Sequence, residues 1–165
     1  MILGEKKLLD SLEKLSQTDL YDAVAKGIKT VQAEAKSLSP VHDRELRDSI
    51  YTSVETRDGN IVGTCYTNKS YAAYVEFGTG PKGQANHEGI SPDVAVFYRQ
   101  SPWWIHESQV GRETAERYGW TYIDTPDGRF YRCSGQAAQP YMYPALKNNE
   151  QEIEKIFEEA VKKKK

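Results

Sequence analysis

Cysteine is scarce in this sequence: Cys65 and Cys133 are the only two among 165 residues, and they lie far apart. Their separation fits neither a redox C-x-x-C motif nor the ligand spacing of a zinc site. A disulfide between them is possible, but a chain of this length can fold without one. We therefore expect reduced thiols and a cytoplasmic site of synthesis.

Long apolar runs are also missing. No stretch approaches the roughly 20 apolar residues that a membrane-spanning helix requires, so we expect no membrane partner. The opening residues, MILGEKKLLD, lack the extended apolar region of a secretory signal peptide. The pattern therefore predicts a protein that is made inside the cell and stays there or is assembled there.

An excess of positive charge is absent as well. The chain has 22 Lys and Arg residues against 24 Asp and Glu residues, for a net charge of −2. General nucleic-acid binders usually present a basic face, so this balance argues against a sequence-specific nucleic-acid partner. The basic run at residues 162–165 is typical of a solvated helix end.

The sequence contains few of the residue patterns that are typical of catalytic or metal-binding sites. The histidines are scattered, without a second ligand at metal-binding spacing, and no serine lies in a G-x-S-x-G elbow. Glu76, between Val75 and Phe77, is the best lone carboxylate, but a hydrolase would need a second carboxyl group opposite it. The candidates for that second group are Asp93, Glu107 and Asp124. We expect no catalytic residue, metal or cofactor, and a Glu76-dependent hydrolase stays an alternative.

Residues 78–83 read GTGPKG, which matches the G-x-G-x-x-G spacing of a dinucleotide-binding loop. Such a loop must leave a buried strand and enter a helix. Pro81 could begin a helix, but the following QANHEGISPD has no apolar periodicity, and Gly89 and Pro92 oppose a helix. The glycines are therefore interpreted as ending a helix and turning the chain.

Helical periodicity is clearest over residues 19–38, where apolar residues recur every three or four positions. They are Leu20, Val24, Ile28, Val31, Ala35 and Leu38. Thr18 is a suitable N-cap and Pro40 ends the helix. Leu8, Leu12 and Leu15 mark a shorter helix before it. A C-terminal helix is expected from Pro144, with Ile153, Ile156, Phe157 and Ala160 as its apolar stripe.

Strand periodicity appears in two places. Residues 50–57 alternate in polarity, Asp58-Gly59 supplies a tight turn, and residues 61–67 return, which predicts a hairpin. A second hairpin is predicted within residues 120–133, turning at Pro126-Asp127-Gly128, and ETAERY before it suggests one or two helical turns. The segment SYAAYVEFG favours a two-turn helix between Ser70 and Gly78, with Tyr71, Tyr74 and Phe77 on one flank.

Aromatic residues are concentrated late in the chain: eleven of the eighteen lie between Phe97 and Tyr143. One interpretation is a small satellite core. A second is a protein–protein contact surface, because Trp and Tyr dominate binding hot spots. A third is stacking of single-stranded nucleic acid, which would also require nearby cations. The candidate interface residues are Glu76, Gly78, Thr79, Gly80, Trp103, Trp104 and Trp120.

Four motifs in this order resemble one family, the neck or tail-completion proteins of long-tailed bacteriophages, related to minor tail protein Z of lambda. The motifs are AKSLSPV, ELRDSI, YAAYVEFGTG and GQAAQPYMYPAL. One departure is the HDRE at residues 42–45, where relatives usually have an Asp-Thr-Gly turn.

This resemblance implies an α+β fold with a long N-terminal amphipathic helix packed on an antiparallel sheet and a C-terminal helix. Residues 1–165 would form a single domain carrying an aromatic-rich hairpin insertion at about 81–134. It also implies a non-enzymatic virion protein that joins the head or neck to the tail, as a homo-oligomeric ring, a hexamer in the family. The implied partners are tail-tube, tail-terminator or neck proteins.

Overall fold

The computed structural model describes residues 17–40 and 44–162. These residues divide into two compact units. Unit 1 comprises the described residues up to Ala72 and those from Tyr141 onward, and unit 2 comprises Ala73–Pro140. The predicted helix marked by Leu8, Leu12 and Leu15 lies outside the described residues.

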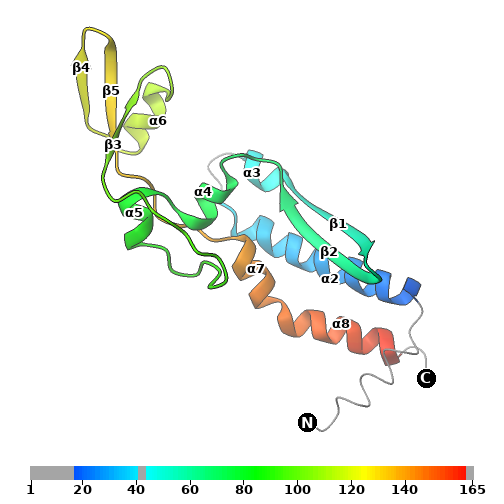
Figure 1. Cartoon of the computed structure of the whole chain (residues 1–165). Helices are drawn as coiled ribbons and strands as arrows, with labels where there is room; N and C mark the ends of the chain where they lie inside the picture. Colours follow the sequence, from blue (N-terminus) through cyan, green and yellow to red (C-terminus); the bar gives the residue numbers. More distant parts are fainter. Residues whose placement is uncertain (1–16, 41–43, 163–165) are drawn as a thin grey trace. The chain divides into compact units, whose positions relative to one another are not determined.

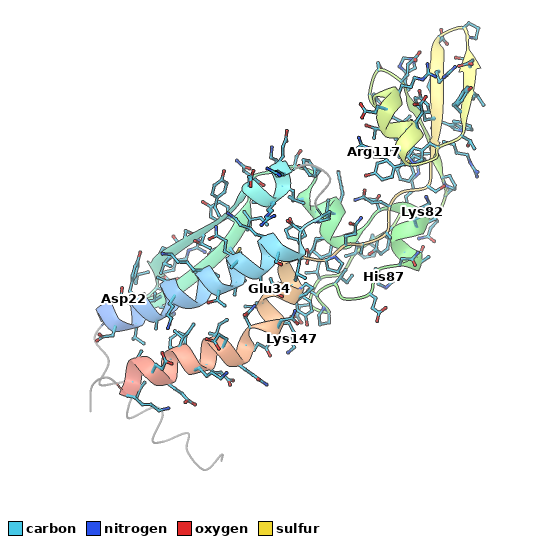
Figure 2. The ribbon with its side chains drawn as sticks, turned by 180° about the vertical axis from the view of Figure 1, so that it is seen from behind. Asp22, Glu34, Lys82, His87, Arg117 and Lys147 are labelled. Carbon is cyan, nitrogen blue, oxygen red and sulfur yellow. The ribbon has the colours of Figure 1, made fainter. Side chains whose placement is uncertain are left out.

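The helix α2, Gln17–Leu38, is the centre of unit 1 and confirms the main periodic signal. It lies between the hairpin β1–β2 on one side and α8 on the other (Figure 1). Its exposed charges, such as Asp22, and those of α7, such as Lys147, lie on the surface of the unit (Figure 2).

The buried face of α2 follows a row of positions four residues apart. Along this row Val31 is 3% exposed and Ala35 is 0% exposed, and the row ends at the buried Ser39. Val24 and Ile28 are half-buried beside it. The prediction for Leu38 is wrong, because its side chain is 39% exposed. Leu38 follows Ala35 by three positions, so it leaves the row that Ser39 continues.

A short helix that was not predicted, α3 (Arg44–Asp48), precedes the first strand. Leu46 is buried on its inner side. The Ser49 hydroxyl lies 2.7 Å from the carbonyl oxygen of Leu46 and 2.7 Å from Thr67 Oγ1. These bonds end the helix and fix the start of the hairpin to its last residue.

The predicted first hairpin is confirmed as β1 (Ile50–Arg57) and β2 (Asn60–Thr67), paired antiparallel from Ile50↔Thr67 to Arg57↔Asn60. Asp58 and Gly59 have φ angles of 49° and 78°, as a two-residue turn of this kind requires. Gly63 faces α2 so closely that an added methyl group would lie 2.9 Å from Val24 Cγ1. The absence of a side chain there lets helix and sheet approach.

The C-terminal part of unit 1 is a pair of helices, α7 (Met142–Asn148) and α8 (Glu150–Lys162). The predicted helix therefore begins before Pro144 and is interrupted at Asn149, whose side chain donates to the carbonyl of Ala145. The apolar stripe is confirmed: Ile156 is buried, and Ile153 approaches Gly27 of α2.

Unit 2 contains two short helices near its start, most of α4 (Ala72–Phe77) and α5 (Gly80–Ala85). It also holds a three-stranded antiparallel sheet with the order β3-β5-β4. The strands are β3 (Trp103–His106), β4 (Tyr122–Thr125) and β5 (Gly128–Cys133). The helix α6 (Arg112–Arg117) lies between β3 and β4 in sequence (Figure 1).

The second hairpin and the helical turn of ETAERY are thus confirmed, whereas β3 had not been predicted. Because Thr125 pairs with Gly128, the turn between β4 and β5 consists of Pro126 and Asp127. The α+β class is confirmed by these helices and antiparallel strands. The single domain with an insertion at about 81–134 stays a prediction; unit 2 itself spans Ala73–Pro140.

Candidate interaction site

The candidate site begins at the end of α4, where Gly78 terminates the helix. Its N–H donates to the carbonyl of Tyr74 at 3.0 Å, and its φ is 73°. The predicted left-handed helix end at Gly78 is therefore confirmed. The helix is shorter than predicted, because it begins at Ala72 rather than directly after Ser70.

Directly after Gly78, the chain is joined to a distant segment by an isolated antiparallel bridge between Thr79 and Gln136. The backbone N–H of Thr79 donates to the Gln136 carbonyl at 2.9 Å, and the N–H of Gln136 donates back to the Thr79 carbonyl at 3.1 Å. Gln136 Nε2 also donates to the Tyr74 carbonyl at 2.7 Å. The bridge connects the two downstream motifs, FGTG and GQAAQ, within unit 2.

The glycines around this bridge allow two backbones to pack directly against each other. A methyl group added at Gly135 would lie 1.8 Å from the carbonyl oxygen of Thr79. One added at Gly78 would lie 2.7 Å from the backbone nitrogen of Ala138 and 2.9 Å from Gly83 Cα. The G-x-G-x-x-G spacing is therefore explained by backbone packing at this crossing. The chain does enter a helix at Gly80, but α5 ends at Ala85, after six residues.

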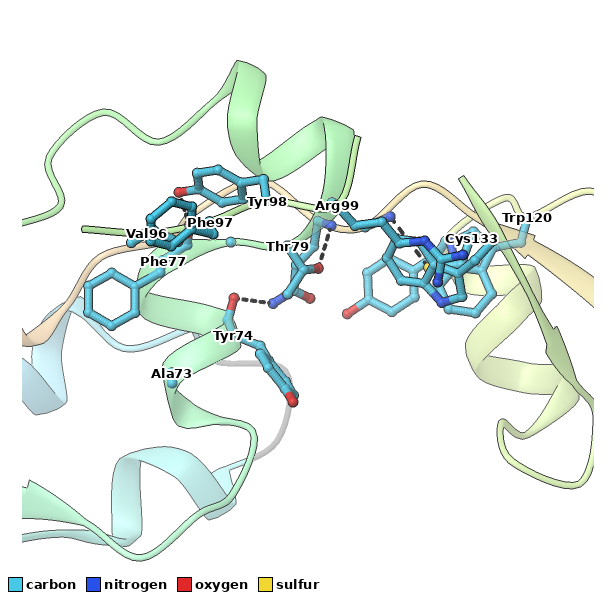
Figure 3. Close-up of a pocket in the computed structure, with 16 residues that line it drawn as sticks. Ala73, Tyr74, Phe77, Thr79, Val96, Phe97, Tyr98, Arg99, Trp120 and Cys133 are labelled. Carbon is cyan, nitrogen blue, oxygen red and sulfur yellow. Dashed lines mark hydrogen bonds between the residues drawn. The ribbon is translucent and has the colours of Figure 1, made fainter. Parts of the chain in front are cut away.

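A pocket of about 670 Å³ opens beside the bridge, entirely within unit 2 (Figure 3). Aromatic side chains and the backbone of the glycines form much of its wall. The lining residues are Ala73, Tyr74, Phe77, Gly78, Thr79, Gly80, Val96, Phe97, Tyr98, Arg99, Trp103, Tyr118, Trp120, Cys133, Gly135 and Gln136.

Contacts among the aromatic residues hold one wall of this pocket in place. The Trp103 ring packs on Gly80, where an added methyl group would lie 2.7 Å from Cζ3. The guanidinium of Arg99 lies 5.2 Å from the centre of the Trp103 ring, within the range of a cation–π contact. Tyr118 and Trp120 stack with their centroids 5.8 Å apart.

The other wall is set by Tyr98, whose hydroxyl donates to the Phe77 carbonyl at 2.8 Å. Burial raises the pKa of Tyr98 above its ordinary value, which further favours the protonated hydroxyl that donates this bond. The neighbouring Phe97 is 96% exposed. The pocket is thus bordered by a fixed tyrosine and a phenylalanine that is almost fully in solvent.

The structure brings together five of the residues predicted from the sequence, because Gly78, Thr79, Gly80, Trp103 and Trp120 all line the pocket. The remaining two, Glu76 and Trp104, do not line it. Glu76 is 5% exposed and so lies inside the protein, whereas Trp104 is 46% exposed.

Tyr74 was predicted to share one flank of its helix with Tyr71 and Phe77, but its side chain is 59% exposed whereas theirs are half-buried. Tyr74 lines the pocket, which accounts for the exposure of its side chain. Phe97, Tyr98 and Arg99 also line the pocket but were not predicted from the sequence. Their alternation of exposed and half-buried side chains is a strand-like signal, but these residues belong to no strand.

The two cysteines and the histidines His87 and His106 occupy structural positions. Cys65 and Cys133 are free thiols, and burial raises the pKa of both, which disfavours the reactive thiolate. His87 stacks on Tyr98, and His106 Nε2 bonds the Asp127 carbonyl at 2.9 Å. No group of three or more His, Cys, Asp or Glu residues within 17–40 and 44–162 is arranged to hold a metal ion.

None of the helices in the described ranges is both long enough and apolar enough to cross a membrane.

Comparison with known protein families gives a match for the first part of the chain. Residues 6–78 match the family model described as "Bacteriophage HK97-gp10, putative tail-component". The matched part covers α2, α3, the first hairpin and α4, and it ends at Gly78. No curated protein and no solved structure matches the chain significantly. The resemblance to phage tail proteins is confirmed by this match, while GQAAQPYMYPAL lies outside it.

Proposed function

We propose that this chain, a member of the bacteriophage tail-component family through its residues 6–78, joins the head or neck of a long-tailed phage to its tail. In this role it is a ring-forming part of the virion, made in the bacterial cytoplasm and built in at the neck. It acts by shape and surface complementarity rather than by catalysis. Its partners would be further copies of itself and tail-tube, tail-terminator or neck proteins.

The family match supports the tail assignment, and the pocket of unit 2 supports a role in contact with another protein. Large aromatic side chains in a concave apolar site are the usual anchors of protein–protein interfaces. Tyr118 is 48% exposed and Phe97 is 96% exposed at the rim. Exposing such side chains together does not stabilise a monomer. We therefore expect an apolar side chain of a partner protein to occupy the pocket.

The nucleic-acid alternative is weakened by how three of the five arginines of unit 2 are paired. Arg112 contacts Glu116 at 2.7 Å, and Arg117 contacts Glu113 at 3.0 Å. Arg129 makes a two-point contact with Asp124. Stacking sites for single-stranded nucleic acid combine aromatic rings with cations that follow the phosphates, and here these cations already face carboxylates.

The hydrolase alternative depended on Glu76 as an accessible carboxylate. Its side chain is buried and lies outside the pocket lining, so it receives no support as a substrate-binding group.

Binding to isolated phage tails tests the proposal. Wild-type protein should decorate one end of purified tail tubes in electron micrographs. Tyr118→Ala, which truncates a half-exposed pocket residue, should weaken this binding about tenfold or more. Ile123→Ala is the matched control, since Ile123 is 46% exposed in unit 2 and does not line the pocket. Failure of the wild type to bind tails, tube ends or neck proteins would contradict the proposed function.

A further inference from the structure

The outer edge of strand β2 is an open hydrogen-bonding surface. In an antiparallel pair, alternate residues direct their backbone N–H and C=O groups away from the partner strand. The carbonyls of Ile50 and Val54 in β1 point outward, because side chains of α2 reach them. Their cross-strand partners are Thr67 and Gly63, so the outward set of β2 contains Ile61, Gly63, Cys65 and Thr67.

The two outer edges of this hairpin differ in whether their outward backbone groups accept hydrogen bonds. On the β1 edge, the Tyr21 hydroxyl donates to the Val54 carbonyl at 3.3 Å. On the same edge, Gln32 Nε2 donates to the Ile50 carbonyl at 2.7 Å. On the β2 edge, none of the hydrogen bonds in the part of the chain that the structure describes reaches the outward backbone of Ile61, Gly63 or Cys65.

The β2 edge also lacks the usual protection against pairing. Proteins shield exposed strand edges with charged residues, proline, bulges or a short strand length. β2 is eight residues long, and its sequence NIVGTCYT contains neither a charge nor a proline. With only β1 beside it, the sheet of unit 1 has two strands, fewer than a stable sheet usually has.

Unit 2 contains a segment without regular secondary structure whose composition suits a strand. Residues 94–98, VAVFY, are rich in strand-forming residues and carry no charge, but they belong to no strand. Val96 and Tyr98 are half-buried, whereas Ala95 and Phe97 are exposed, as in a strand with one covered face; Val94, at the start of the segment, is 43% exposed and does not follow this alternation. Within the described ranges, the backbones of Ala95, Val96 and Phe97 take part in no hydrogen bond.

We propose that residues 94–98 of one copy pair with the outer edge of β2 in the next copy, as an added strand. Both segments present unpaired backbone groups and both are uncharged, so their pairing brings no charge into contact with another. Phe97, at 96% exposure, would be covered by the contact. Adding an extended segment to an open sheet edge is a common mode of recognition between proteins.

The two surfaces are different, so each copy offers a segment to one neighbour and an edge to the other. Such a head-to-tail contact closes into a ring when the rotation between copies allows it. The β1 edge cannot replace β2 in this contact, because α2 already occupies its carbonyls of Ile50 and Val54. This inference rests on the ring formation in the proposed function and assigns the contact that builds the ring.

The first test removes one outward N–H from the β2 edge. Cys65→Pro should raise the dissociation constant of self-association about tenfold or more, because proline cannot donate to an added strand. Thr52→Pro is the matched control: Thr52 is the cross-strand partner of Cys65 and its N–H points outward from the opposite edge. Equal assembly of the two variants would overturn the proposal.

The second test changes the segment without disturbing the fold of its own chain. Phe97→Lys alters a side chain that is 96% exposed, so its melting temperature should equal that of the wild type while self-association is lost. Ile123→Lys, at a residue 46% exposed on β4, should leave assembly unchanged. Normal assembly of Phe97→Lys would overturn the proposal even if Cys65→Pro proved too unstable to measure.

Photocrosslinking identifies the contact directly. Phe97 is replaced by p-benzoylphenylalanine in unlabelled chains, which are mixed with ¹⁵N-labelled wild-type chains on tail tubes. Crosslinks from position 97 to labelled residues 60–67 would support the proposal. Crosslinks within one chain, or to another region of the neighbour, would overturn it while leaving ring formation intact. A wild type that stays monomeric on tails would instead contradict the ring formation of the proposed function.

Discussion

Thr79 and Gln136, 57 positions apart in sequence, exchange backbone hydrogen bonds and hold the start and end of unit 2 together. The crossing is possible because Gly135 has no side chain. A methyl group there would lie 1.8 Å from the carbonyl oxygen of Thr79, far inside van der Waals contact. The pocket wall built from Gly78, Thr79 and Gln136 depends on this bridge.

Gly135→Ala should therefore lower the unfolding free energy of unit 2 by more than the cost of placing alanine in a left-handed backbone conformation. Its φ of 81° costs alanine about 1–2 kcal/mol, and the overlap with Thr79 adds roughly 1–3 kcal/mol. Gly119→Ala is the control, because Gly119 has a φ of 63° and nothing within 4 Å of an added methyl group. Chemical denaturation of both variants measures the difference, and equal losses would contradict the steric explanation.

The elements that the sequence predicted are those with regular local patterns. The periodic apolar residues of α2 and the Asp58-Gly59 turn specify their structures within a few residues, so neighbouring residues alone predict them. The short helix α3 and the strand β3 were missed because neither is long enough to show a period. Leu38 was misplaced because the apolar pattern does not show where the row of buried positions ends.

The candidate site was predictable only in part, for a related reason. The glycines and tryptophans are unusual enough to be noticed in the sequence, and Gly78, Gly80, Trp103 and Trp120 do line one pocket. Their meeting depends on the bridge between Thr79 and Gln136, which no local pattern reveals. Burial of Glu76 likewise follows from tertiary packing around α4 and could not be read from its neighbours in the sequence.

Val31→Asp should unfold unit 1, because Val31 is only 3% exposed on the inner face of α2. An unpaired buried carboxylate costs several kcal/mol, which is comparable to the whole stability of a domain, about 5–15 kcal/mol. Ala33→Asp introduces the same residue at an exposed position of the same helix and should cost below about 1 kcal/mol. Circular dichroism melting compares them, and a Val31→Asp variant that melts like the wild type would contradict the helix packing.

Gly63 and Val24 should be energetically coupled, because an added methyl group at Gly63 would lie 2.9 Å from Val24 Cγ1. Gly63→Ala alone should cost roughly 1–3 kcal/mol through overpacking of α2 against β2. In a Val24→Ala background this overlap is removed, so the same substitution should cost less. A double-mutant cycle should give a coupling energy of about 0.5–3 kcal/mol, whereas additive effects would show that the helix moves away freely.

Acid should weaken unit 2 through Asp124. Arg129 Nε and Nη2 donate to its two carboxylate oxygens at 2.7 and 3.0 Å, and these bonds hold the pKa of Asp124 below its ordinary value of 3.8. A depressed pKa in the folded state means that the contribution is present above the ordinary pKa and is lost as pH falls through the folded one. The unfolding free energy of unit 2 should thus decrease between about pH 5 and pH 2.

Asp124→Asn should flatten this pH dependence, because asparagine cannot gain a proton over the same range. Asp93→Asn, at an exposed carboxylate elsewhere in unit 2, is the control and should change the slope less. Because the side chain of Asp124 is 63% exposed, about 1 M salt should also reduce the slope by screening its attraction to Arg129. Denaturant titrations at several pH values measure these slopes, and an unchanged slope in Asp124→Asn would show that the Asp124–Arg129 pair does not stabilise the β4–β5 hairpin.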